Sequence, residues 1–141
     1  MRRLGGLLLL ALVCVSAQAK APAPAVVRVQ FATSAGWLYN SRGQSTLTVT
    51  GAGAALPTVY PLTAGGSRDP ADPALRGRLL PVTVEVGGPF GGASRVLTLR
   101  ATLFLCDHLR GVCTVREQQH RVTVRAGQPS TVTFPAPKDS P

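Results

Sequence analysis

Two cysteines in the second half of the chain are the residues best suited to carry chemistry. Cys106 and Cys113 flank residues 107–112, a short and mostly polar segment that contains one glycine. In an exported protein, a pair of cysteines is typical of a disulfide bond. Such a bond either stabilises the fold or exchanges electrons with the thiols of another molecule. Exchange requires a sulfur that an incoming thiolate can reach and a departing thiolate that its surroundings stabilise.

Two basic side chains lie between the cysteines. His108 and Arg110 are candidates to stabilise a thiolate at either cysteine, and Asp107 opposes them. The alternative is that these residues are polar because loops are polar, and that the bond is purely structural. Spacing alone favours the structural role, because six intervening residues do not make a compact redox motif of the Cys-x-x-Cys kind.

A predicted β-hairpin positions the two cysteines. Alternate residues from Leu97 to Leu105 are apolar, and residues 121–125 alternate again after the second cysteine. A period of two is typical of a strand with one buried face. Two antiparallel strands joined by a short loop bring the Cα atoms at their mouth within disulfide range.

The rest of the chain predicts short strands without convincing helical periodicity. Residues 64–74 are rich in glycine, proline and aspartate, so we expect turns and no core there. Pro81 indicates an edge position or the beginning of a strand. In all, about seven or eight strands at turn spacing predict an all-β sandwich. Besides the hairpin, the expected extended segments are 27–31, 37–39, 46–50, 57–62, 79–86 and 131–134.

The start of the chain predicts export. Arg2 and Arg3 precede an apolar run from Leu4 to Val15, and an Ala-x-Ala cleavage site ending at Ala19 follows. That order is typical of a signal peptide, and the run is too short to span a bilayer. We therefore expect a periplasmic or extracellular protein without a stable membrane span after cleavage. The predicted boundaries are 1–19 for the signal peptide, 20–26 for a flexible lead-in, 27–135 for the domain and 136–141 for a tail.

Charge and composition restrict the class of partner. The formal net charge is +9, but the arginines are scattered over alternate strand positions, which favours solvated outer faces of strands. Nucleic-acid binding needs a basic stripe with stacking aromatics, so no nucleic-acid partner is predicted. Arginine outnumbers lysine and isoleucine is absent, which indicates a bacterial, GC-rich coding bias.

Other chemistries find weaker support in the sequence. Cys106, His108, Cys113 and His120 are possible metal ligands, but their spacing matches no zinc pattern and export favours the disulfide. No nucleophile elbow or carboxylate pair indicates a hydrolase. Trp37 and the tyrosine two residues later suit a binding platform or, more often, a sandwich core. We predict no metal and no cofactor.

The cysteine hairpin resembles a known family. Leu99 to Val124, with its two cysteines, resembles the N-terminal periplasmic domain of DsbD thiol:disulfide interchange proteins. The segments Gly36-Trp-Leu-Tyr39 and Arg76-Gly-Arg-Leu-Leu-Pro-Val-Thr-Val84 are similar to family segments in the same order. A related cysteine hairpin occurs in the C-terminal β-domain of NHL-repeat proteins. The resemblance covers most of the chain after the predicted signal peptide, and only the cysteine hairpin is specific to the family.

The resemblance implies an immunoglobulin-like β-sandwich and a redox function. By this resemblance, Cys113 forms the mixed disulfide with an oxidised exported protein and Cys106 resolves it. The family covers its cysteines with a cap loop, which corresponds here to Ala64 to Pro73 and carries no aromatic side chain. Redox partners have to be supplied in trans. The remaining alternative is a non-catalytic binding or scaffold module with a structural disulfide.

Overall fold

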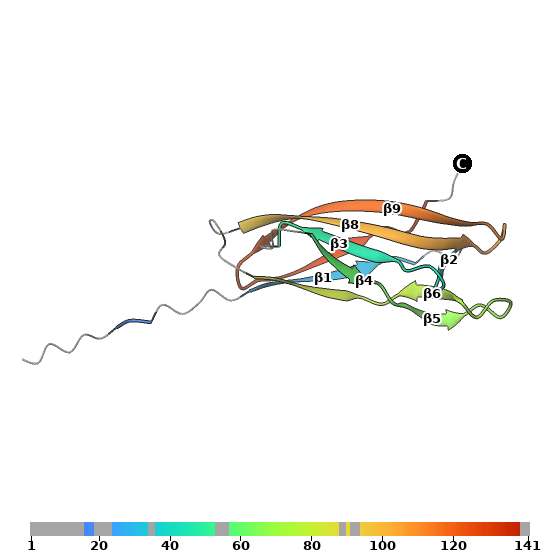
Figure 1. Cartoon of the computed structure of the whole chain (residues 1–141), viewed down its shortest axis with the longest axis horizontal. Coiled ribbons are helices and arrows are strands. Elements are labelled where there is room, and N and C mark those ends of the chain that lie inside the picture. The colour runs from blue at the N-terminus through green and yellow to red at the C-terminus, as the bar shows by residue number, and fades with distance from the viewer. Residues whose placement is uncertain are drawn as a thin grey trace, which may run out of the picture.

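The computed structural model describes residues 16–18, 24–33, 36–52, 57–87, 90 and 94–138. They form ten strands in two packed sheets (Figure 1), which confirms the predicted all-β sandwich and raises the predicted strand count. Of the predicted signal peptide, only residues 16–18 fall within this description. None of the described residues forms a helix long and apolar enough to cross a membrane.

The smaller sheet has three strands in the order β10–β1–β7. Its central strand, β1 (Ala25–Phe31), pairs in parallel with β10 (Pro129–Phe134) and antiparallel with β7 (Val82–Val86). Alternate residues of β1 are buried, as its sequence predicts. The strand begins at Ala25, inside the segment predicted as a flexible lead-in.

The larger sheet is built around β8 (Ser94–Asp107), which pairs along its whole length with β9 (Cys113–Arg125). The other edge of β8 is shared by two consecutive strands, β3 and β2. Two hairpin partners extend the sheet, β4 beside β3 and β5 beside β6. The bounds of these strands are β2 (Trp37–Asn40), β3 (Thr46–Thr50), β4 (Thr58–Pro61), β5 (Ala64–Arg68) and β6 (Leu75–Leu79).

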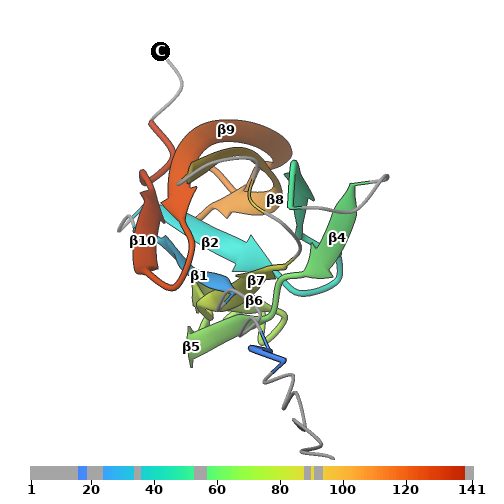
Figure 2. The same cartoon turned by 90° about the vertical axis from the view of Figure 1, so that its left-hand side faces the viewer.

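One hydrophobic core fills the space between the sheets. The alternate residues of β8 that are apolar in the sequence, from Leu97 to Leu105, all lie in it. Valines of β1 and β7 close it from the smaller sheet. On one side β9 curves over to β10 (Figure 2), where the His120 ring packs edge-on against Phe134 with centroids 4.8 Å apart. β4 lies on the opposite side of the molecule in the same view.

The segment 64–74 differs from the prediction. It contains β5 and a well-ordered turn rather than turns alone, and Asp69 within it is buried. The alternation of apolar and polar residues does not predict β5, because this strand is rich in glycine. Order comes instead from pairing with β6 and from side-chain acceptors, since Asp69 Oδ1 accepts from the Ala71 and Asp72 amides at 2.7 and 3.2 Å.

The predicted strand 79–86 is two strands in different sheets. β6 ends at Leu79, and β7 begins at Val82 directly after Pro81, as the proline indicated. Between them the chain passes from the larger sheet to the smaller one, and Leu80, which alternates in the sequence with the apolar residues of β7, is 38% exposed. The single run of alternating residues over 79–86 therefore covers parts of two strands that belong to different sheets.

Candidate functional site

The β8–β9 hairpin holds Cys106 and Cys113 directly opposite each other, and they form a disulfide bond as predicted. The turn between them is tight because one carboxylate organises it. Asp107 Oδ1 accepts from the amides of Leu109 and Arg110 at 2.8 and 3.1 Å. Gly111 takes a positive φ of 65°, which suits glycine, and its amide donates to the Asp107 carbonyl.

The two sulfur-bearing residues differ sharply in exposure. Cys106 lies on β8, which has β2 on one edge and β9 on the other, and it is 2% exposed. Cys113 is the first residue of β9, the outermost strand on that side of β8, and it is exposed. An incoming thiolate therefore meets Cys113 first.

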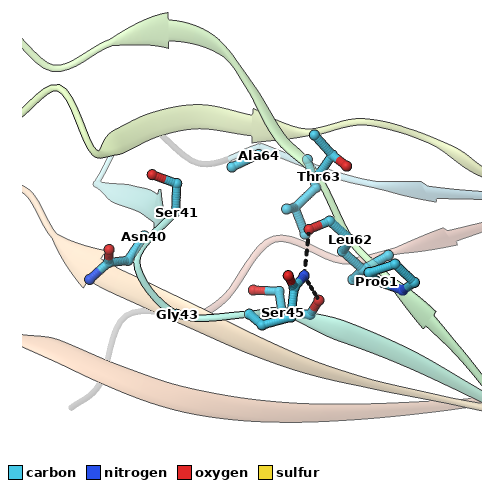
Figure 3. Close-up of a pocket in the computed structure, with 10 residues that line it drawn as sticks. Asn40, Ser41, Gly43, Ser45, Pro61, Leu62, Thr63 and Ala64 are labelled. Atoms are coloured by element: carbon cyan, nitrogen blue, oxygen red, sulfur yellow. Dashed lines mark hydrogen bonds between the residues drawn. The ribbon is translucent and has the colours of Figure 1, made fainter.

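A side-chain amide lies against the buried sulfur. Asn40, the last residue of β2, donates from Nδ2 to Cys106 Sγ at 3.6 Å. β2 pairs with the end of β8, so Asn40 and Leu38 project from the same face of the sheet as Cys106. In Figure 3 the Asn40 side chain points away from Ser45 and Leu62. An amide donor at this place stabilises negative charge on Cys106.

The disulfide borders an open cavity of about 310 Å³. Both cysteines line it, together with Asn40 and with residues of the turn between β5 and β6. That turn belongs to the segment expected as a cap over the cysteines. The cavity is large enough to admit a side chain of a partner and lies beside the bond that such a partner would attack.

Arg42 and Asp72 anchor the turn to the loop after β2. Their side chains form a two-pronged ion pair, with Nη1–Oδ2 and Nη2–Oδ1 distances of 2.7 and 2.9 Å. The hydrogen bonds from Arg42 and from the Ala74 amide lower the pKa of the Asp72 carboxyl below its ordinary value. The same pair raises the pKa of Arg42. Ser41 adds a hydrogen bond from its hydroxyl to the Ala74 carbonyl at 2.7 Å.

A contact between a histidine and a carboxylate connects the same turn to the cysteine hairpin. His108 Nδ1 lies 2.9 Å from Asp69 Oδ2, and the Asp69 side chain is only 5% exposed. The His108 amide also donates to the Gly36 carbonyl, which ties the hairpin turn to the start of β2. The turn and the hairpin thus hold one another in place beside the disulfide.

His108 and Arg110 lie in the hairpin turn, as the sequence indicates, and each faces a carboxylate. His108 pairs with Asp69, and Arg110 Nε lies 3.7 Å from Asp107 Oδ2. Asn40, which sequence reasoning missed, is the side chain that contacts a sulfur atom. Its only signal in the sequence is its position directly after the segment Trp37–Tyr39.

The other candidate residues are apart from the disulfide. His120 packs on Phe134 at the side of the core, away from Cys106 and Cys113, so the four possible ligands do not converge. Among the described residues, no three His, Cys, Asp or Glu side chains gather as a metal site would require. Trp37 and Tyr39 are buried core residues and form no exposed platform.

A second cavity, of about 210 Å³, lies on the other side of the loop after β2 (Figure 3). Its lining carries hydroxyl and amide groups and no titratable side chain. Gln44 closes part of it, since Nε2 donates to the carbonyls of Ser45 and Leu62 at 2.9 and 3.2 Å. This lining offers no acid, base or charge for catalysis.

No protein-family model matches the chain, and no curated protein matches it. The function is therefore inferred from the geometry of the site.

Proposed function

We propose that this chain is a thiol–disulfide exchange domain that uses the Cys106–Cys113 pair. The observation that carries the proposal is the asymmetry of the bond. Cys113 is an exposed residue that an incoming thiolate can approach, and the sulfur of the buried Cys106 receives a hydrogen bond from Asn40. An attackable sulfur joined to a stabilised leaving thiolate is what exchange requires.

Reduction of the domain proceeds in two displacements. The thiolate of a donor attacks Cys113 Sγ, so that a bond forms between the two sulfurs while the Cys113–Cys106 bond breaks. Cys106 leaves as a thiolate and takes the electron pair, with the Asn40 amide donating to it. A second thiolate of the donor then attacks the donor sulfur of the mixed disulfide, which releases Cys113 as a thiolate and leaves the donor oxidised.

Transfer to a client reverses these roles. The Cys113 thiolate attacks a client disulfide, and one client sulfur leaves as a thiolate. Cys106 then attacks Cys113 Sγ, re-forms the intramolecular bond and releases the second client thiolate. Two electrons pass to the client in each cycle, and no metal or cofactor takes part.

The cellular setting is part of the proposal. A carrier of the DsbD N-terminal type works outside the cytoplasm, where a disulfide persists, and a signal peptide over residues 1–19 would deliver it there. Its donor and its clients are separate proteins. Three exposed apolar side chains beside Cys113, those of Leu109, Val112 and Val115, offer such partners a contact surface.

The test is the reduction potential of the bond in the domain without residues 1–19, equilibrated in dithiothreitol or glutathione buffers. A potential well above roughly −300 mV, with circular dichroism unchanged on reduction, supports a carrier. A lower potential together with unfolding on reduction would contradict it. The domain would then be a binding or scaffold module, and the bond would be a structural one.

A further inference from the structure

Three arginines share one face of the β5–β6 hairpin. Arg76 and Arg78 are two residues apart on β6 and so project from the same face. Arg68 on β5 is the direct cross-strand partner of Arg76, which places it on that face as well. Arg68 and Arg78 are exposed and Arg76 is half-buried. We call these three residues the arginine face.

The arginine face is not neutralised by the described part of the chain. Arg76 Nη1 reaches only a carbonyl, that of Gly66, at 3.4 Å. The nearby carboxylates have other partners, since Asp69 pairs with His108 and Asp72 with Arg42. Within the described residues, none of the three arginines takes part in an ion pair.

Like charges on directly opposed residues of a strand pair destabilise the pair. The pairing of Arg68 with Arg76 therefore places two like charges opposite each other, beside a register shift in the β5–β6 ladder. Negative charge from another molecule would compensate them. β5 is the outermost strand of its sheet, so the face is open to such a molecule.

The arginine face adjoins the disulfide site. Arg68 lines a hollow of about 210 Å³ together with Leu38, Pro70, Asp69 and His108. Asp69 and His108 also line the disulfide cavity, so the contact between these two side chains forms the shared wall of the two hollows. The β5–β6 turn and the β8–β9 turn lie at the same end of the molecule (Figure 1).

We propose that the arginine face docks the redox partner, and that this partner is a protein with acidic side chains beside its reacting cysteine. The inference rests on the proposed function and adds the partner's charge. Arg68 of this face lines the hollow that shares the Asp69–His108 wall with the disulfide cavity, and exposed apolar side chains flank Cys113. Charge complementarity there would raise the rate of encounter more than the strength of the complex.

The experiment compares two cysteine peptides as reductants of the oxidised domain, one flanked by glutamates and the other by glutamines. At low salt, we expect the glutamate peptide to reduce the unchanged domain about tenfold faster than it reduces the variant R68E/R76E/R78E. This difference in rate should vanish at high salt. The glutamine peptide should react alike with both proteins. If the charge-reversed variant does not fold, R68Q/R76Q/R78Q takes its place.

A matched control reverses three exposed arginines on other strands, in the variant R28E/R121E/R125E. The control should keep most of the preference for the glutamate peptide. An equal loss in both variants would overturn the proposal, because net charge alone would then explain the effect. Arginine-dependent binding to phosphatidylglycerol vesicles, without any preference between the peptides, would also overturn it in favour of a membrane surface.

Failure of the proposed exchange reaction gives a different experimental result from failure of docking. If dithiothreitol and both peptides leave the bond intact, the exchange reaction is wrong. Docking is then measured separately by fluorescence anisotropy, with a glutamate peptide in which serine replaces cysteine. Binding that is lost in R68E/R76E/R78E and kept in the control supports the arginine face, and equal binding to all three proteins contradicts it.

Discussion

Cys106 and Cys113 have the same chemistry and unequal surroundings. Cys106 is enclosed because strands flank β8 on both edges, whereas Cys113 is the first residue of the outermost strand, β9. The Asn40 amide reinforces the difference by donating to the enclosed sulfur. The direction of attack in the proposed exchange follows from these neighbours.

Replacing Asn40 by alanine tests the contribution of its amide. A hydrogen bond to a charged group contributes about 1.5–3 kcal/mol, so N40A should raise the pKa of the reduced Cys106 thiol and slow reduction by dithiothreitol about tenfold or more. Stopped-flow rates and the thiolate absorbance against pH give the two quantities. S41A is the control, because that hydroxyl donates to the Ala74 carbonyl and not to a sulfur. Equal rates for N40A and the unchanged protein would refute the role of the amide.

At the scale of elements, the loop between β2 and β3 decides where Asn40 lies. Both strands pair with the same edge of β8, and the loop crosses above Phe104 between them. The Phe104 amide donates to Ser45 Oγ at 3.0 Å, which fixes the loop to β8. Gly43 lies so close to the Phe104 ring that a Cβ there would overlap a ring carbon.

The substitution G43A should therefore destabilise the domain by about 1–3 kcal/mol, the usual effect of overpacking. G87A is the matched control, since a Cβ on Gly87 meets nothing within 4 Å. Its effect should stay within about 0.5 kcal/mol. Urea unfolding of both variants measures the difference. Equal unfolding midpoints would contradict the close packing of this loop on β8.

The turn between β5 and β6 should loosen in acid. The pKa of Asp72 is lowered in the folded state, mainly by the hydrogen bonds from Arg42. Its contribution to stability is present above the unfolded pKa and is lost as the pH falls through the lower folded value. Hydrogen exchange of the Ala74 amide, corrected for intrinsic rates, should rise below about pH 4. R42Q should show raised exchange at neutral pH already, and a rate unaffected by this variant would contradict the anchoring role.

At the scale of the whole molecule, the disulfide joins residues that the sheet already holds together. β8 and β9 pair in continuous register from Ser94–Arg125 to Cys106–Cys113, and Cys106, although buried, lies outside the contiguous hydrophobic cluster between the sheets. The domain should therefore keep its fold in the reduced state, as a carrier must.

The variant C106S/C113S tests whether the domain keeps its fold without the disulfide bond. Closing so short a loop contributes roughly 2.5 kcal/mol in the chain-entropy model, so the double variant should lose about that much of its free energy of unfolding and remain folded. Urea titration followed by circular dichroism tests this, with the reduced native domain as the control. A double variant that is unfolded in the absence of urea would favour a structural bond.

The sequence predicts the parts of the molecule that depend on local periodicity. β1, β3, β8 and β10 show alternating apolar residues, and the cysteine pair follows from the hairpin between two such runs. β5 and β6 escape prediction because their order depends on Asp69 and Asp72 acting as acceptors. Asn40 escapes because its contact joins residues 66 positions apart. The arginine face could not be predicted because it depends on the register between β5 and β6. The scattered arginines in the sequence do not reveal that register.

The most direct test of the central claim compares the two sulfurs one at a time. The variants C106S and C113S each keep a single site cysteine, and an aromatic disulfide reagent that releases a coloured thiolate reports its reactivity. Because Cys113 is exposed and Cys106 is 2% exposed, we predict that C106S reacts at least about ten times faster than C113S. Equal rates, or a faster C113S, would contradict the assignment of Cys113 as the attacked sulfur and Cys106 as the leaving thiolate.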